Sequence, residues 1–165
     1  MVLIVGASGA GKSILLREMA AGVPAAEAVD IAEVRVPPGG AVFDALPGGL
    51  TETLEILATA GLNDLYTLLE SPADLSSGEL YRFRLACALA SRPPVLFADD
   101  FGQGLDSITA SVVASNLHRF AKRWGTTIIL ASNRLDFAAD LEPDILVETD
   151  FTSPARAIYK DRRRQ

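Results

Sequence analysis

The chain has 165 residues, of which 49% are hydrophobic and 22% are charged, and these proportions fit one globular domain. Its formal net charge of -6 excludes a generally basic surface, so we expect no direct nucleic-acid binding. The single cysteine excludes an intramolecular disulfide, and no apolar run is long enough for a transmembrane segment. Together these features predict a cytoplasmic protein.

The first predicted elements are a strand at residues 2–5 and a helix over about 12–21, with a glycine-rich turn between them. The strand is a continuous apolar run, which is typical of a strand buried on both faces of a parallel sheet. The helix ends at Gly22, a residue suited to the position after a helix. Short strand candidates follow at residues 34–36 and 41–43.

The middle of the chain is predicted to be helical. One helix covers residues 52–60, a shorter one is capped by Asn63 and runs through Leu69, and a third covers residues 78–90. A proline pair after the third helix prevents it from continuing.

The second half of the chain alternates strands with a helix. Strands are predicted at residues 95–98, 126–131 and 144–148, and a helix with one apolar face at residues 108–124. Strands that alternate with helices predict an α/β fold with a mostly parallel sheet.

The turn after the first strand carries the clearest motif, G-x-x-x-x-G-K-[ST]. Its glycines let backbone N–H groups surround phosphate oxygens, and the helix start behind it adds a positive dipole end. We expect Lys12 to bind the β and γ phosphates and the Ser13 hydroxyl to ligate Mg²⁺. The motif predicts nucleotide binding without choosing between a kinase, a GTPase and an ATPase. Its residues are Gly6, Ala7, Ser8, Gly9, Ala10, Gly11, Lys12 and Ser13.

A second set of small residues opens the helix at 78–90. Free N–H groups at a helix start form an anion site, and a chain that already binds phosphate at residues 6–13 has little use for another. One use is the phosphate held by a neighbouring subunit, whereas the alternative is an ordinary serine-rich helix cap. The residues concerned are Ser76, Ser77, Gly78 and Glu79.

Two acidic residues follow the strand at 95–98. An apolar strand ending in Asp99 is the Walker B arrangement, in which the carboxylate is held beside Mg²⁺. Asp100 comes next and can polarise the attacking water as a general base, although it can also be a simple loop acid.

These motifs, in this order, resemble those of the ABC ATPases. Leu75 to Glu79 resembles the family's signature, Asp99-Asp100 its Walker B pair, and Gly104-Leu105-Asp106 its D-loop. Asn133 stands where the family has its switch histidine. The resemblance covers Val2 to about Thr149.

The resemblance implies a three-layer P-loop NTPase fold of the ABC type. We expect an ATPase domain over residues 1–155, a reduced helical insert at about 45–90, and a solvated basic tail over 156–165. The resemblance also implies an ATPase that binds Mg-ATP in a head-to-tail homodimer, with residues 6–13 of one copy facing 76–79 of the other, and that drives or gates a partner protein. Lys12, Asp100 and Asn133 are its expected catalytic residues, and Asp106 an expected nucleotide contact.

Three departures from the family pattern predict slow hydrolysis. Asp100 replaces the usual glutamate with a shorter side chain, and Asn133 cannot carry charge. Asp44 lies where the Q-loop glutamine is expected and can coordinate Mg²⁺. The alternatives are therefore a nucleotide-gated binding module with negligible turnover, or a transporter-associated ATPase subunit.

A narrower resemblance concerns the partner. The segments 81–86, 100–102 and 141–147 are similar to a small ABC-type subgroup joined to GNAT-type acetyltransferases, which implies such a partner. The interval between Ser13 and Leu75 is short, which argues against a conventional transport role. The few residues before the phosphate loop include no aromatic to stack on the base, so we expect other groups to hold it.

Overall fold

The computed structural model describes residues 1–37 and 39–160, and its centre is a six-stranded sheet. The strand order is β2-β3-β4-β1-β5-β6, and all neighbours are parallel except β5 and β6. The mostly parallel sheet that the sequence predicts is confirmed. The strands are β1 (Val2–Val5), β2 (Ala28–Asp30), β3 (Val95–Ala98), β4 (Thr127–Ser132), β5 (Ile145–Glu148) and β6 (Arg156–Tyr159).

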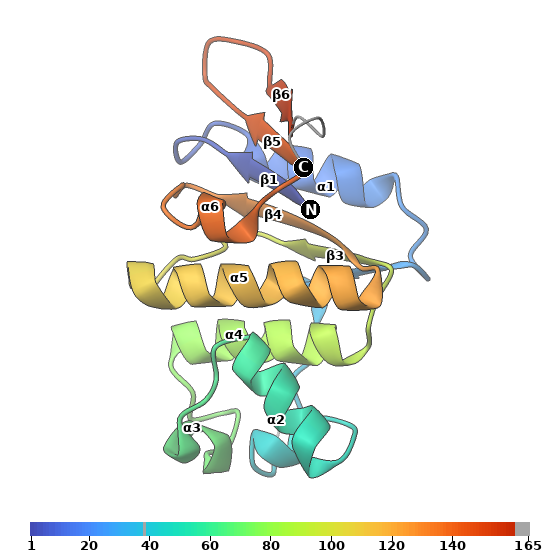
Figure 1. The fold of residues 1–165 in the computed structure, drawn as a ribbon, viewed down its shortest axis with the longest axis vertical. Coiled ribbons are helices and arrows are strands. Elements are labelled where there is room, and N and C mark those ends of the chain that lie inside the picture. Colours follow the sequence, from blue (N-terminus) through green and yellow to red (C-terminus); the bar gives the residue numbers. More distant parts are fainter. Residues whose placement is uncertain (38, 161–165) are drawn as a thin grey trace.

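Helices cover both faces of the sheet, which makes the expected three-layer α/β fold (Figure 1). On one face lies α1 (Lys12–Ala21), and on the other lie α4 (Ser77–Ala90), α5 (Ser107–Trp124) and the short α6 (Ala138–Leu141). Farthest from the sheet are α2 (Leu50–Thr59) and α3 (Leu65–Leu69). None of the described helices is long and apolar enough to cross a membrane.

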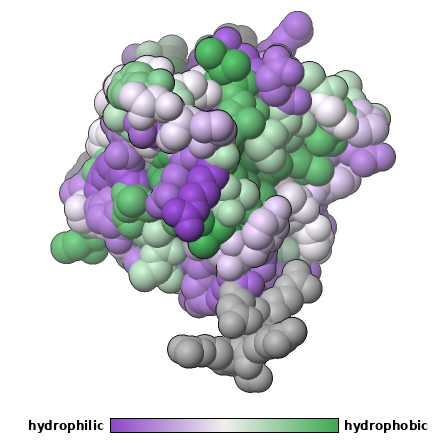
Figure 2. Space-filling view, turned by 90° about the horizontal axis from the view of Figure 1, so that it is seen from above, coloured by the Kyte–Doolittle hydropathy of each residue, from purple (hydrophilic) through white to green (hydrophobic). Residues whose placement is uncertain are grey.

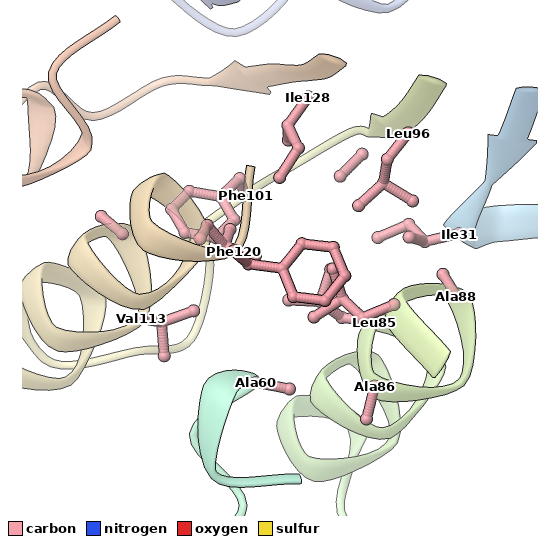
Figure 3. Packing of buried hydrophobic residues seen from close by; sticks show 14 of the residues in the cluster. Ile31, Ala60, Leu85, Ala86, Ala88, Leu96, Phe101, Val113, Phe120 and Ile128 are labelled. Atoms are coloured by element: carbon pink, nitrogen blue, oxygen red, sulfur yellow. The ribbon is translucent and has the colours of Figure 1, made fainter. Parts of the chain in front are cut away.

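The two faces of β1 contribute to two separate cores. Val2 and Ile4 pack with Leu16 of α1, whereas Leu3 and Val5 belong to the larger core on the opposite face. Side chains alternate along a strand, so a strand covered on both faces must be apolar throughout. Figure 3 shows the larger core, in which Phe101 and other apolar side chains fill the space between the sheet, α4 and α5.

The carboxyl ends of four strands meet at one edge of the sheet. Val5 of β1 is paired with Ser132 of β4 and with Glu148 of β5, and Ala98 of β3 is paired with Leu130. The loops after β1, β3, β4 and β5 therefore start side by side, at the edge where α/β proteins bind ligands.

Three local predictions are wrong. Residues 34–36 and 41–43 form no strands: the first is irregular and the second leads into a 3-10 turn at Phe43–Ala45. The strand in this region is β2, whose three residues carry too weak a pattern to predict, and which pairs with β3. Asp64, not Asn63, caps α3, because its Oδ2 accepts from the Thr67 backbone N–H at 3.2 Å.

The predicted tail at residues 156–165 needs a correction as well. Arg156–Tyr159 form β6, which pairs antiparallel with β5, and the Lys160 Nζ lies 2.9 Å from a carboxylate oxygen of Glu142. Cross-strand pairing with β5 therefore orders this part of the expected tail. Residues 161–165 lie outside the described residues.

Candidate nucleotide site

The phosphate loop connects β1 to α1 and depends on its glycines. Gly9 and Gly11 have φ angles of 83° and 88°, in the left-handed region that side chains other than glycine rarely adopt. A Cβ on Gly6 would lie 2.3 Å from the Oγ1 and 2.4 Å from the carbonyl oxygen of Thr149. The loop thus has the backbone that curls around an anion, pressed against the segment after β5.

The Lys12 side chain is buried and folds back over this loop. Its Nζ donates to the carbonyl oxygens of Gly6 and Ala7, both at 2.9 Å. No described side chain caps α1 and its first turn contains no acid, so its first N–H groups and its dipole are available to an anion. A positive amine and the free amides of one glycine-rich turn fit a phosphate group.

The two acidic residues after β3 have different environments. The half-buried Asp99 accepts the Asp100 backbone N–H through Oδ1 at 2.9 Å, and its carbonyl accepts from the Tyr81 hydroxyl at 2.9 Å. Asp100 is exposed and has a φ of 52°, a strained conformation for a residue that is not glycine. Asp99 is therefore held in place, while the Asp100 carboxylate faces solvent.

Tyr81 of α4 was not predicted to contribute to this site. Desolvation, with the charges of Asp100 and Asp99, raises the pKa of its phenol, so Tyr81 stays a neutral donor. The sequence carried one indication of this contribution: Tyr81 lies in the helix that begins at the signature segment, Leu75 to Glu79. Tyr81 thus ties that helix to the end of β3.

The end of β4 is fixed by a buried serine. Ser132 Oγ donates to the Phe101 carbonyl at 2.7 Å and accepts from the Arg134 backbone N–H at 3.1 Å. Asn133, between them, is exposed, so its amide is presented at the same edge as the phosphate loop.

Arg134, also missed by sequence reasoning, holds the loop between Asp100 and Asp106. Its Nη1 donates to the carbonyl oxygens of Gly102 at 2.8 Å and Leu105 at 2.5 Å. Its Nε donates to Asp136 Oδ1 at 3.0 Å, and this pairing lowers the pKa of Asp136 to about 2. The only sequence signal was its position directly after Asn133, the predicted switch residue.

Asp106, the expected D-loop contact, caps α5. Its Oδ1 accepts from the Thr109 backbone N–H at 2.9 Å and its Oδ2 from the Thr109 hydroxyl at 2.6 Å, which lowers the pKa of Asp106. A contact between Asp106 and nucleotide stays a prediction.

The start of α4 is exposed, as a site for another subunit requires, but it is already capped. Ser76 and Ser77 are exposed, and Gly78 and Glu79 are half-buried. Ser76 Oγ accepts from the Glu79 backbone N–H, while the Glu79 carboxylate accepts from the Ser76 backbone N–H in return. Hydrogen bonds to Ser76 lower the pKa of Glu79, so a negative charge occupies this helix start.

A groove of about 910 Å³ lies between the start of α4 and the end of β3. The structure brings together there the signature residues, Asp99 and Asp100, with Tyr81 and Arg82 on its wall. The phosphate loop does not line this groove, although Asp99 and Asp100, which are expected to act at the bound phosphates, do.

Asp44 lies in the 3-10 turn Phe43–Ala45 and is exposed. Within residues 1–37 and 39–160, no group of three or more His, Cys, Asp or Glu residues could hold a metal ion, so Asp44, Asp99 and Asp100 do not form one. An ion bound together with phosphates would draw on a different donor set, which includes a Ser or Thr hydroxyl, an aspartate and phosphate oxygens, and ligation by Ser13 and Asp99 stays a prediction. Metal ligation by Asp44 stays a prediction.

A glycine loop with a lysine between a buried strand and a helix, and an aspartate at the end of a second strand, define a P-loop NTPase. No family model matches the chain, but curated relatives do. The aliphatic sulfonates import ATP-binding protein of Frankia alni is 30% identical over 98% of this chain and 73% of that protein. The corresponding protein of Paracoccus denitrificans is 31% identical over 90% of this chain and 68% of that protein. The chain belongs to the family of ABC-type ATP-binding proteins.

Other relatives are much longer than the matched region. The chain spans 30% of the methionine import ATP-binding protein of Pectobacterium atrosepticum, at 33% identity over 68% of this chain. It spans 61% of the aliphatic sulfonates import protein of Yersinia pestis. The chain thus spans less than two thirds of these relatives.

Solved structures confirm the fold. A dimeric post-hydrolysis ATP-binding cassette bound to ADP and Pi superimposes with a TM-score of 0.74 at 19% identity, over 96% of this chain and 84% of the other. A bacterial ABC exporter with ATP bound gives a TM-score of 0.66 at 22% identity, over 90% of this chain and 32% of the other. The α/β fold of the ABC cassette is therefore present here.

Proposed function

We propose that the chain binds Mg-ATP in a head-to-tail dimer, hydrolyses it slowly, and uses this cycle to drive or gate a partner protein. The observation that supports this is that the phosphate loop and the exposed start of α4, the two predicted anion sites, lie apart on one copy. The phosphate loop lies between β1 and α1, whereas Ser76 and Ser77 are exposed at the start of α4 beside a groove that the phosphate loop does not line. A second copy, turned head to tail, brings one surface opposite the other.

The residues of this chain have separable roles in the proposed reaction. Lys12 and the loop amides bind the phosphates, and Ser13 and Asp99 would hold Mg²⁺, which neutralises phosphate charge. Asp100 accepts a proton from the attacking water. The water oxygen bonds to the γ phosphorus while the bond to the β–γ bridging oxygen breaks, which releases ADP and phosphate.

Slow turnover is expected from two groups that we place beside the reacting water. The Asp100 side chain is short and starts from a strained backbone, and Asn133 presents a neutral amide instead of an imidazole. The same observations favour the second candidate, a nucleotide-gated module with negligible turnover. Steady-state phosphate release separates the two, because turnover that disappears in Asp100→Ala rejects the second.

The partner can be of two classes. The relatives are named as import ATP-binding proteins or as the ATP-binding protein of a lipoprotein-releasing system, which supports a transporter partner. The likeness of segments 81–86, 100–102 and 141–147 to acetyltransferase-linked proteins supports a GNAT-type partner instead. Co-purification with each class distinguishes them.

The dimer is tested by light scattering with and without Mg-ATP. Asp100→Asn is expected to accumulate an ATP-bound dimer, because binding is retained and proton transfer is lost. Lys12→Ala is expected to remain monomeric and to bind no ATP. A wild-type chain that binds no ATP, or that binds it and stays monomeric at every concentration, contradicts the proposal.

A further inference from the structure

We propose that Phe151 is the platform on which the base of the bound nucleotide stacks. This inference rests on the proposed nucleotide binding and adds a site for the base, to which no residue has so far been assigned. It starts from the segment between β5 and β6, which lies at the same edge of the molecule as the phosphate loop (Figure 1).

The segment contacts the phosphate loop at two points. Gly6 lies against the backbone and hydroxyl of Thr149, whose N–H donates to the Val5 carbonyl at 2.8 Å. Gly9 faces the ring of Phe151, so that a Cβ on Gly9 would lie 3.5 Å from Cε1 and 3.8 Å from Cζ. The ring is therefore adjacent to the backbone that is expected to hold phosphates.

The exposure of this ring sets it apart from other phenylalanines of the chain. Phe151 is 67% exposed, whereas Phe83, Phe97, Phe101 and Phe137 are at most 1% exposed. Hydrophobic side chains lie among hydrophilic ones on the side of the molecule that carries the β5–β6 hairpin (Figure 2). A large apolar ring left in water beside a polar site is available to a flat ligand.

The Phe151 backbone is also held in a turn. Asp150 Oδ1 accepts the Phe151 N–H at 2.7 Å, and Asp150 Oδ2 accepts from the Thr152 hydroxyl at 3.1 Å. The short aspartate side chain thereby fixes the direction of the chain at the ring. The backbone that carries the ring is therefore preorganised, and both carboxylate oxygens of Asp150 accept hydrogen bonds within the turn.

The strand order places the ring on the correct side for a base. Asp100 follows β3, which is separated from β1 by β4, whereas Phe151 follows β5 on the opposite side of β1. The γ-phosphate must lie toward Asp100, where water attacks, so the rest of the nucleotide extends the other way. That direction leads across Gly9 to Phe151.

Stacking on a ring gives affinity for a base but little selectivity between different bases. Every nucleobase has a π-face, and stacking on an aromatic side chain is tolerant of sequence for that reason. Selection between adenine and guanine needs hydrogen bonds to base edges, which a phenyl ring cannot make. We therefore expect similar affinities for ATP and GTP.

Calorimetric titration of the full chain with Mg-ATP and with Mg-tripolyphosphate tests this assignment. Phe151→Ala is expected to weaken Mg-ATP binding by about tenfold or more and to leave tripolyphosphate binding unchanged, because only ATP carries a base. Phe151→Tyr is expected to restore ATP binding. The matched control is Tyr159→Ala, which removes a 72% exposed aromatic at the far end of the same hairpin and should change neither titration.

A fluorescence measurement covers the case in which the alanine variant does not fold. Phe151→Trp is expected to add an emission that ATP and GTP quench and tripolyphosphate does not, above the background from Trp124 of the wild type. Wild type that binds neither ATP nor tripolyphosphate overturns the proposed function itself. The base platform alone is overturned if wild type binds both ligands and Phe151→Ala binds ATP as tightly as wild type does. It is also overturned if Phe151→Ala loses affinity for ATP and for tripolyphosphate equally.

Discussion

Glu79 accepts two hydrogen bonds from Ser76, one from its backbone N–H at 3.0 Å and one from its hydroxyl at 2.5 Å. The carboxylate thus occupies amide and hydroxyl donors that, in the proposed dimer, belong to the phosphate of the other copy. Its lowered pKa keeps it charged at neutral pH, so it repels that phosphate while it stabilises its own helix.

Replacing Glu79 with glutamine is therefore expected to tighten the ATP-dependent dimer. Glutamine at this position keeps the reciprocal cap and removes the charge. Like charges about 4 Å apart near a protein surface repel by roughly 1 to 4 kcal/mol, so we expect roughly a tenfold lower dimer dissociation constant in Mg-ATP. Sedimentation velocity measures it, with Glu55→Gln on the exposed face of α2 as the control. A dimer that is unchanged or weaker in Glu79→Gln contradicts the proposed contact.

The phosphate loop and the strand before it were predictable because local chemistry determines them. Residues 2–5 are apolar throughout because both faces of β1 are covered, and the glycines after them are required by backbone angles and by a close approach. Asp99 was predictable for the same reason, since a strand buried on both faces must end where the first carboxylate appears.

The supporting contacts were not predictable, because partners distant in sequence supply them. Tyr81 meets the Asp99 carbonyl only when α4 packs beside β3, and Phe151 meets Gly9 only when β5 pairs with β1. Strand β2 is a similar case, because its three residues form a strand through pairing with β3 and not through their own pattern.

Replacing Gly6 with alanine is expected to distort the phosphate loop. The new Cβ would lie 2.4 Å from the Thr149 carbonyl oxygen, a backbone atom that cannot rotate away. Overpacking of this kind costs roughly 1 to 3 kcal/mol, which corresponds to a fall in Tm of about 3 to 10 °C for a domain of this size. ATP binding should fall with it. Gly39→Ala is the control, because a Cβ there meets nothing within 4 Å, and an unchanged Tm in Gly6→Ala would contradict the expected clash.

The pairing between Arg134 and Asp136 predicts how stability depends on pH. The folded-state pKa of Asp136 is lowered to about 2 from an ordinary 3.8, so its contribution is complete above about pH 4 and is lost as the pH falls toward 2. Urea unfolding of wild type and Asp136→Asn between pH 7 and pH 3 measures it. The difference in midpoint should be constant from pH 7 to about pH 5 and should shrink below about pH 4. A difference in urea midpoint that grows as the pH falls would contradict the prediction.

The last prediction concerns Arg134 as a positioning residue for the loop between Asp100 and Asp106. Its Nη1 donates to the carbonyls of Gly102 and Leu105, so the guanidinium fixes the loop without touching the phosphate loop in any described contact. Arg134→Met should therefore reduce kcat for phosphate release by about tenfold or more, since misplaced catalytic groups cost on the order of a hundredfold per Å. The affinity of the monomeric protein for ATP should change by less than twofold.

The split between kcat and binding distinguishes this role from a merely structural one. A general loss of folding would weaken ATP binding together with turnover, whereas a displaced loop affects turnover alone. Arg134→Lys should recover only part of kcat, because an ammonium lacks the fork that reaches two carbonyls and a carboxylate at once. Arg119→Met removes an exposed arginine of α5 and serves as the control. If Arg134→Met keeps wild-type kcat, the loop does not need this side chain, and the positions of Asp100 and Asp106 must be set by the capping of α5 and the end of β3.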